Sequence, residues 1–282
     1  MLGSLSILAT LALQAGNTTS SAELLQAVDS AAALASSNAS PQDYVGFNPG
    51  EPALVGGRVK SDDSLAWPVK YPTDHYAQMY FGAQKGSFNF NVIVEDSEGK
   101  QVFKSGKPAR TQSVSFQPKA NIEYIVIIEP IKGSKAQSAQ IAGILAVVGR
   151  GIVLKPSAFS AGARRLVRES APLLKGSGFV QSMNLFAVPL LPGTSAGAQA
   201  REAGRTQTKN TMAVVSDGRA KSFTAVLRTP DGALAGSSRN VGAAKALKIT
   251  VEANANGHPG APLHLTNTSK STSVFFGAIV NR

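Results

Sequence analysis

The sequence predicts a mainly β protein made of two antiparallel β-sandwich units of the jelly-roll or immunoglobulin-like type. A helical segment is expected at the N-terminus and a short helix between the units. Three observations lead to this fold. From about residue 44 onward, apolar and polar residues alternate with the period of two that half-buried strands require. Turn-forming residues separate these alternating stretches. The same order of stretches and turns then occurs a second time in the chain.

The first set of alternating stretches lies in the first half of the chain. Every second residue from Phe88 to Val94 is apolar, which places these side chains on one face of a predicted strand. A turn follows at residues 96–99, which end in glycine. Residues 113–117 alternate again. Residues 124–128 are continuously apolar, which predicts a strand covered on both faces.

The second set repeats the first at a constant distance. Phe223 lies 133 residues after Phe90, and Gly232 lies 133 residues after Gly99. The letters of the two copies are mostly different, so the signal is the shared order of faces and turns. This order predicts a duplication.

These patterns divide the chain into four parts. A chain of 282 residues is long enough for two hydrophobic cores of ordinary size. Inside the second unit, residues 193–210 are rich in small and polar residues, which predicts a long mobile loop. The expected parts are an N-terminal helical or signal-like region at residues 1–40, a first sandwich unit at 41–155, a linker with a short basic helix at 156–178, and a second sandwich unit at 179–282.

The first 15 residues have two interpretations. They are nearly uncharged and apolar and end next to small residues, which is typical of a secretory signal. Their leucines also recur at near-helical spacing, which predicts a helix retained in the protein. The run is shorter than the roughly 20 apolar residues that a membrane-spanning helix needs. Export and retention therefore both stay open.

Two helices are predicted outside this region. Ser20 and Glu23 have the spacing of a capping box, which starts the first helix. The second helix covers residues 158–171 and ends before Pro172. The expected buried side chains are Leu24, Leu25, Val28, Ala32 and Ala35 in the first helix and Phe159, Leu166 and Val167 in the second, where Arg164, Arg165 and Arg168 are expected to be exposed.

Charge and cysteine content restrict the possible partners and chemistry. The net charge of +11 and the pI near 9.9 favour polyanions such as nucleic acid or acidic polysaccharide. Aromatic residues, at 6%, are too few to predict a base-stacking surface. The absence of cysteine excludes disulfides, thiolate catalysis and cysteine-bound metals.

The order of strands and turns resembles a known family. A hydrophobic strand, an Asp-x-x-Gly or Pro-Asp-Gly turn, a Val-x-Phe or Leu-x-Ile strand, and a corner before residues 124–127 are similar to bacterial pre-peptidase C-terminal (PPC) β-sandwich domains. The resemblance covers roughly residues 75–150 and 208–282. It implies non-catalytic modules of exported proteins that act in binding, spacing or assembly. The sequence Asn-Ile-Glu-Tyr at 121–124 departs from the Gly-x-Tyr corner of that family.

One sequence motif suggests catalysis. The sequence Gly-Thr-Ser-Ala-Gly around Ser195 matches the nucleophile elbow, in which glycines permit a strained turn that exposes a serine. Asp217 or Asp231, followed by His258 or His264, would complete the order of a Ser, Asp, His triad. The elbow requires a parallel sheet with interleaved helices, whereas the surrounding pattern predicts antiparallel strands. A flexible loop is therefore the preferred interpretation.

Other polar residues give no firm catalytic or metal site. Asp74 and His75 are neighbours whose side chains face opposite ways in an extended chain. The three histidines lack metal-ligand spacing, and no nucleotide-binding motif is present, so no cofactor is predicted. Turns that could bind calcium through carboxylates, although turn formation alone explains them, contain Asp96 with Glu98 and, separately, Asp217 and Asp231.

The leading hypothesis is a non-catalytic structural or interaction protein that binds a protein partner or copies of itself. The last strand, residues 274–280, is apolar on both faces, so it must be central in a sheet or covered by a neighbouring subunit. An exported envelope module and a shell or coat subunit both fit, which leaves an extracellular, periplasmic or particle location open. The alternatives are a serine hydrolase using Ser195 and a carbohydrate-binding module. The only tryptophan, Trp67, is expected in the core or anchoring a loop, so an exposed aromatic platform is missing.

Overall fold

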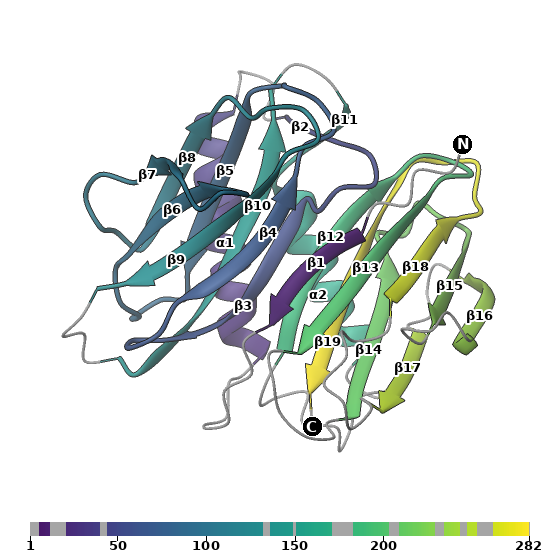
Figure 1. Ribbon diagram of the computed structural model, residues 1–282. Coiled ribbons are helices and arrows are strands. Elements are labelled where there is room, and N and C mark those ends of the chain that lie inside the picture. Colours follow the sequence, from purple (N-terminus) through teal and green to yellow (C-terminus); the bar gives the residue numbers. More distant parts are fainter. Residues whose placement is uncertain are drawn as a thin grey trace.

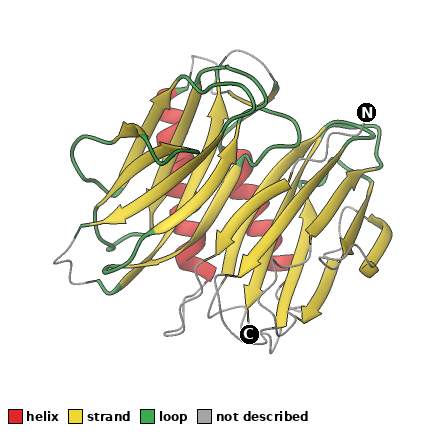
Figure 2. Cartoon of the chain, in the orientation of Figure 1, coloured by secondary structure: helices red, strands yellow, loops and turns green. Residues whose placement is uncertain are grey.

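The computed structural model describes residues 6–11, 21–39, 44–131, 136–148, 151–170, 183–202, 209–228, 234–242, 247–252 and 262–281. These residues form two helices and several mostly antiparallel sheets (Figures 1 and 2). The predicted fold class, mainly β with two antiparallel sandwich units, is confirmed. Neither described helix is long and apolar enough to cross a membrane.

In chain order the elements are β1 (Ser6–Leu11), α1 (Ser21–Asn38), β2 (Val45–Phe47), β3 (Leu54–Lys60), β4 (Leu65–Lys70), β5 (Ala77–Ala83), β6 (Phe90–Asp96), β7 (Gln101–Lys104), β8 (Thr111–Phe116), β9 (Glu123–Pro130), β10 (Ser138–Val147), β11 (Ile152–Leu154), α2 (Ser157–Ser170), β12 (Met183–Leu190), β13 (Ser195–Glu202), β14 (Lys209–Ser216), β15 (Ser222–Arg228), β16 (Leu234–Gly242), β17 (Leu247–Glu252), β18 (Pro262–Asn267) and β19 (Ser273–Asn281).

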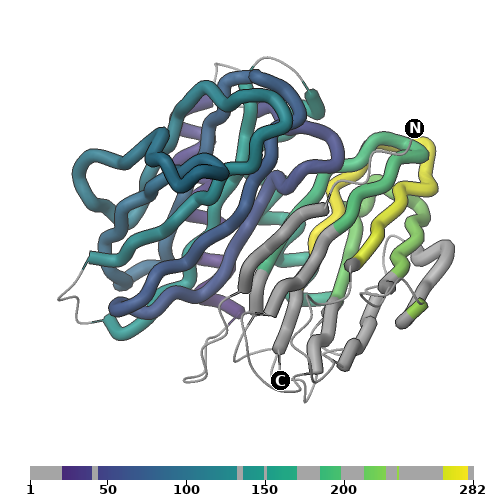
Figure 3. The backbone as a smooth tube through the Cα atoms, viewed as in Figure 1, coloured from purple at the N-terminus to yellow at the C-terminus, as the bar shows by residue number. Residues whose placement is uncertain are grey.

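The largest sheet runs through both halves of the molecule. Its strand order is β11-β2-β10-β3-β12-β19-β14-β17, and β5 and then β8 continue it from the other side of β10. The halves are joined where β3 pairs with β12, with Val55 opposite Phe186. Figure 3 shows the first half, purple to teal, directly beside the second half, green to yellow. The two sandwich units therefore share one continuous sheet.

Three layers surround this sheet. The sheet β4-β9-β6-β7 covers one face of the first half, and the sheet β1-β13-β18-β15-β16 covers the same face of the second half (Figure 1). The helices lie on the opposite face, where α1 packs on β5 and β10, and α2 packs on β14 and β19. Strand β1 pairs in parallel with β13 and contacts β4 of the other small sheet.

The strand pairings confirm the predicted duplication. In the β6–β7 hairpin Ile93 is opposite Lys104, and in the β15–β16 hairpin Val226 is opposite Ser237, so both positions differ by 133. After the next pair of residues, both hairpins also have an irregular register. The equivalent strands are β3 and β12, β4 and β13, β5 and β14, β6 and β15, β7 and β16, β8 and β17, β9 and β18, and β10 and β19.

Each half also begins with a helix. Helix α1 precedes β3 and α2 precedes β12, and both helices pack on equivalent strand pairs. The buried face of α1 is rich in alanine, which allows close approach to the sheet. A Cβ atom on Gly82 of β5 would lie 2.4 Å from the Ala31 nitrogen of α1, so only glycine fits there. The helices are thus part of the repeated unit.

The hydrophobic cores follow the predicted faces. Phe88, Phe90 and every second residue to Val94 are buried between β6 and the large sheet. Trp67 is buried in this core, as expected, and its ring stacks on Phe81 with centroids 6.3 Å apart. On the helix side, Phe159 of α2 is buried as predicted. Each half therefore has a sandwich of ordinary construction.

Three local predictions are wrong. Residues Ser6–Leu11 form strand β1, not a helix, because pairing with β13 supplies backbone hydrogen bonds that spacing alone does not reveal. Residues Ser195–Glu202 form β13, not part of a mobile loop, because β18 pairs with them. Strand β9 alternates and leaves Ile125 37% exposed, so its outer face is not covered. Ser20 of the predicted capping box lies outside the described residues.

The last strand has a partner on each side. Strand β19 lies between β12 and β14 in the large sheet, and its residues from Ser273 to Ala278 are buried. Of the two predicted ways to cover this apolar strand, the structure shows the central position. No neighbouring subunit is needed to explain its composition.

Candidate functional site

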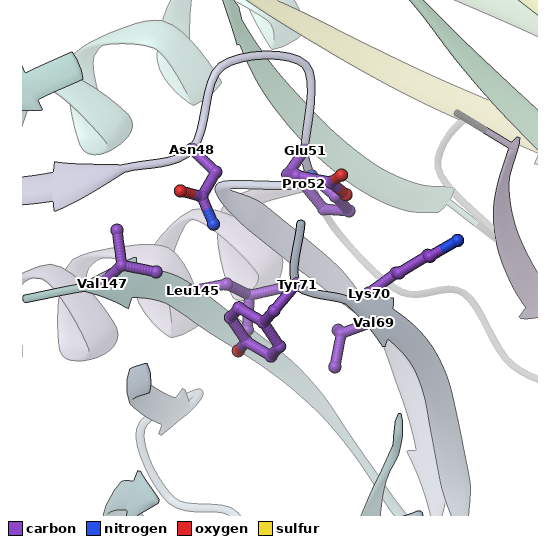
Figure 4. Close-up of a pocket in the computed structure, with 8 residues that line it drawn as sticks. All are labelled: Asn48, Glu51, Pro52, Val69, Lys70, Tyr71, Leu145 and Val147. Atoms are coloured by element: carbon purple, nitrogen blue, oxygen red, sulfur yellow. The ribbon is translucent and has the colours of Figure 1, made fainter. Parts of the chain in front are cut away.

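A small pocket lies at one end of the first sandwich. It is formed between the β2–β3 turn and the ends of β4 and β10 (Figure 4). Its cavity volume is about 10 Å³, which accommodates about one water molecule. A sugar ring or a nucleotide is too large to enter it. The lining residues are Asn48, Glu51, Pro52, Val69, Lys70, Tyr71, Leu145 and Val147.

The β2–β3 turn is held by the second half of the protein. The backbone amide of Gly50 donates to the carbonyl of Pro189 at 2.8 Å, and that of Ala53 donates to Ala187 at 2.8 Å. Gly50 has a φ of 82°, a conformation that favours glycine. The pocket therefore lies at the junction of the two halves.

Glu51 is the unusual residue of the pocket. Its side chain belongs to a residue only 5% exposed, and its Oε1 atom has no hydrogen-bond partner in the described part of the chain. Burial raises the pKa of Glu51 from 4.5 to about 7, and the positive charge of Lys70 opposes this effect. The carboxyl group is thus close to half protonated at neutral pH. We call this the Glu51 pocket.

Tyr71 lines the other side of the Glu51 pocket. Its ring packs edge-on against Phe116 and Tyr124, with centroids 5.9 Å and 6.3 Å away. Burial, together with the negative charges available to Glu51 and Tyr124, raises the pKa of Tyr71 well above its usual value. The phenol therefore stays neutral and cannot serve as a base near neutral pH.

An exposed aromatic and aliphatic surface adjoins the pocket. Tyr44 is 43% exposed and Val153 is 56% exposed, and the Lys155 ammonium lies 5.4 Å from the centre of the Tyr44 ring. Gly46 is opposite both Val153 and Val147 in the sheet, so these residues share the face on which the pocket opens. We call Tyr44, Val153 and Lys155 the tyrosine shelf. An apolar surface next to a few polar groups is typical of a binding site.

Ser195 does not lie on a strand-to-helix elbow. It is the first residue of β13, and it is opposite Thr266 of the antiparallel strand β18. The two hydroxyl oxygens are 2.8 Å apart. His264 is opposite Gly197 on the same strand pair. The backbone geometry required for the predicted elbow is absent at this position.

The acidic residues of the predicted triad do not form a site either. Asp217 accepts hydrogen bonds from the backbone amides of Arg219 at 2.9 Å and Val274 at 3.2 Å, which stabilises the β14–β15 turn. Asp231 and His258 lie outside the described residues. The structure therefore assigns Asp217 a role in a turn.

The other predicted polar sites have local structural partners. Asp96 accepts from the backbone amides of Glu98 at 3.0 Å and Lys100 at 2.9 Å, which closes the β6–β7 turn. Asp74 is exposed and His75 is half-buried. In the ranges that the structure describes, no group of three or more histidine, aspartate or glutamate residues is placed to hold a metal ion.

The basic residues of α2 contact neighbouring segments. Arg164 forms an ion pair with Asp29 of α1 at 2.5 Å, and Arg168 pairs with Glu169 at 2.9 Å. Arg165, predicted to be exposed, is half-buried and lies against Gly218. Helix α2 therefore does not present three free positive charges.

The chain matches no family model and no curated protein sequence. Solved structures with similar folds include the tandem CBM51 modules of a family 98 glycoside hydrolase from Streptococcus pneumoniae, at 12% identity, a TM-score of 0.25, and coverage of 80% of this chain and 83% of that one. The tandem CBM22 domain of Paenibacillus barcinonensis Xyn10C has 10% identity, a TM-score of 0.23, and coverage of 86% and 95%. A periplasmic inhibitor of g-type lysozyme from Aeromonas hydrophila has 12% identity, a TM-score of 0.25, and coverage of 34% and 87%. Similarities this distant carry no inference about function.

Sequence reasoning missed both the Glu51 pocket and the tyrosine shelf. One signal was available, since Glu51 is a single charge between Gly50 and Pro52 in a run of otherwise uncharged residues. Tyr44 gave no such signal, because its exposure depends on how β2 pairs with β11.

Proposed function

We propose that this chain is a non-catalytic interaction protein that binds its partner at the tyrosine shelf beside the Glu51 pocket. The observation that carries this proposal is the exposure of Tyr44 and Val153 next to a buried, unpartnered carboxyl group. Tyrosine is enriched in protein interfaces because it combines a large apolar ring with a polar hydroxyl. The shelf supplies contact area, and the pocket supplies polar groups.

Several features support a binding role over catalysis. The Glu51 pocket has space for about one water molecule, which is too little for a substrate. Tyr71 stays neutral, and Ser195 shares its hydroxyl with Thr266 on a flat sheet surface. The sequence resemblance to PPC-like domains, which implies non-catalytic modules, supports the same proposal. Export and assembly into a particle stay predictions.

A carbohydrate is the second candidate partner. The observation in its favour is an exposed tyrosine ring on the same face as the Asn48 amide and the Glu51 carboxyl group. An aromatic ring can stack on a sugar, while amide and carboxyl groups can bond to its hydroxyls. The sequence analysis found no aromatic platform because Trp67 is buried, and Tyr44 is the exposed ring that the structure adds.

The double substitution of Tyr44→Ser and Val153→Ser tests the binding surface. We expect it to weaken binding at least about tenfold, equal to about 1.4 kcal/mol, because it removes the apolar contact area. Self-association is measured by sedimentation equilibrium, and glycan binding is measured by electrophoresis through gels that contain neutral polysaccharides. Leu234→Ser is the matched control, since Leu234 is 61% exposed on β16 of the second half. Equal binding by the double variant and the wild type in both assays would contradict the proposal.

A fluorophosphonate probe tests the absence of serine hydrolase activity. We expect no adduct at Ser195, because its neighbour is Thr266 and no general base is placed by the described residues to activate it. Mass spectrometry of the labelled chain gives the readout, with Ser195→Ala as the reference. An adduct in the wild type that is missing in the variant would favour the enzyme alternative.

A further inference from the structure

A group of exposed cations lies at the opposite end of β5 from the Glu51 pocket. Ala77, the first residue of β5, pairs with Val147 of the pocket, whereas Ala83, the last residue, donates its amide to the Arg110 carbonyl at 3.0 Å. The cations at this end are Lys85, Lys107 and Arg110, and we call them the basic patch. All three are exposed, and none forms an ion pair with another described residue.

The loop that carries the basic patch is fixed by hydrogen bonds. The Gln112 amide donates to the Lys107 carbonyl at 3.0 Å and to the Phe90 carbonyl at 2.9 Å. Ala109 and Phe90 form an isolated bridge between this loop and β6. Because the backbone is already ordered, little conformational entropy is lost when an anion binds.

The turn that carries Lys85 is also held in place. The Lys85 amide donates to the side-chain oxygen of Gln26 on α1 at 3.3 Å. Glu23, one helical turn earlier on α1, is the acidic residue on this side, and it has interactions of its own. The exposed amide of Asn89 lies on the same β5–β6 connection. The patch is therefore positive, with polar amides around it.

The composition of the basic patch indicates the class of its ligand. The neighbouring aromatic residues, Phe88 and Phe90, are buried, so no ring is available to stack on a nucleic-acid base. Three fixed cations with nearby amides suit negatively charged groups carried on a hydroxyl-rich chain. The net charge of +11 raises the local concentration of any such polymer.

We infer that the basic patch binds the carboxylate or sulfate groups of an acidic polysaccharide. This inference does not depend on the function proposed for the tyrosine shelf, because the two surfaces lie at opposite ends of β5.

Fluorescence anisotropy with labelled heparin and labelled polygalacturonate tests this inference over a series of salt concentrations. The triple variant Lys85→Gln, Lys107→Gln, Arg110→Gln is expected to bind at least about tenfold more weakly at about 50 mM salt. The slope of log affinity against log salt should also become shallower by about 2 to 3, since three ionic contacts are removed. Circular dichroism checks that the variant is folded. Whichever of the two polymers binds more tightly identifies sulfate or carboxylate as the preferred group.

The matched control removes the same charge elsewhere. Lys119→Gln, Lys221→Gln and Lys270→Gln lie in three separate exposed positions, and this variant should bind within about twofold of the wild type. The Tyr44→Ser, Val153→Ser variant should also bind normally, which separates this inference from the proposed function. Equal losses in both triple variants would show a general charge effect and overturn the inference. Absence of binding by the wild type, or tighter patch-dependent binding of duplex DNA, would overturn it as well.

Discussion

Replacing Phe276 with alanine is expected to lower the free energy of unfolding by about 3 to 5 kcal/mol, the largest effect of any substitution proposed for this protein. Phe276 is buried on the central strand β19, and its ring lies 6.2 Å from that of Phe159 on α2. Phe159 in turn lies 5.0 Å from Phe47 on β2 of the first half. Gly162 leaves the space that the Phe276 ring occupies, so alanine would leave a cavity between α2 and the sheet.

Urea unfolding followed by circular dichroism measures this effect. A single transition is expected for both proteins, because the pairing of β3 with β12 makes the two halves one sheet. Leu234→Ala serves as the control, since Leu234 is 61% exposed and its loss should change stability by less than about 0.5 kcal/mol. A loss below about 1 kcal/mol for Phe276→Ala would show that the aromatic contacts do not hold the helix layer to the sheet.

Replacing Glu51 with glutamine is expected to make the protein more stable above neutral pH by about 3 kcal/mol. The pKa of Glu51 is raised from 4.5 to about 7 by burial, and each pKa unit corresponds to about 1.4 kcal/mol. Because the folded protein binds this proton more tightly than the unfolded chain does, the wild type loses stability as the pH rises from about 4.5 through 7. Glutamine cannot ionise, so the variant avoids this loss.

Unfolding free energies at several pH values between 4 and 9 test the role of Glu51. At the acid end the variant and the wild type should have similar stability, since protonated glutamate and glutamine are both neutral. The difference between them should then grow through the window of about 4.5 to 7 and stay constant above it. Glu98→Gln is the control, because Glu98 is exposed in the β6–β7 turn. A difference that does not change with pH would mean that Glu51 ionises normally in the folded protein.

The parts of the fold that alternate in sequence were predictable. The strands around Phe90 and Phe223 have one buried and one polar face, and the spacing of 133 residues between them reflects a real equivalence of hairpins. The helix that contains Phe159 was also predicted, because its apolar residues follow the helical period. Local pattern was sufficient in each case.

Other parts depend on partners far away in the chain. Ser6–Leu11 is a strand because β13 pairs with it, and no property of those residues alone distinguishes this from a helix. Ile125 belongs to an apolar run, yet its sheet lacks a covering layer on that side. The Glu51 pocket is made by three separated segments, so the burial of this carboxyl group could not be derived from sequence.

The contact between β3 and β12 also bears on the ancestry of the protein. These strands are equivalent in the two copies, and they run antiparallel, which is the relation that a two-fold axis produces. A single-copy ancestor with this architecture would form the same contact between two identical chains, as a symmetric homodimer. Fusion of its gene to a second copy would turn that dimer interface into an internal seam and free each copy to acquire its own surface, as the Glu51 pocket in the first half illustrates.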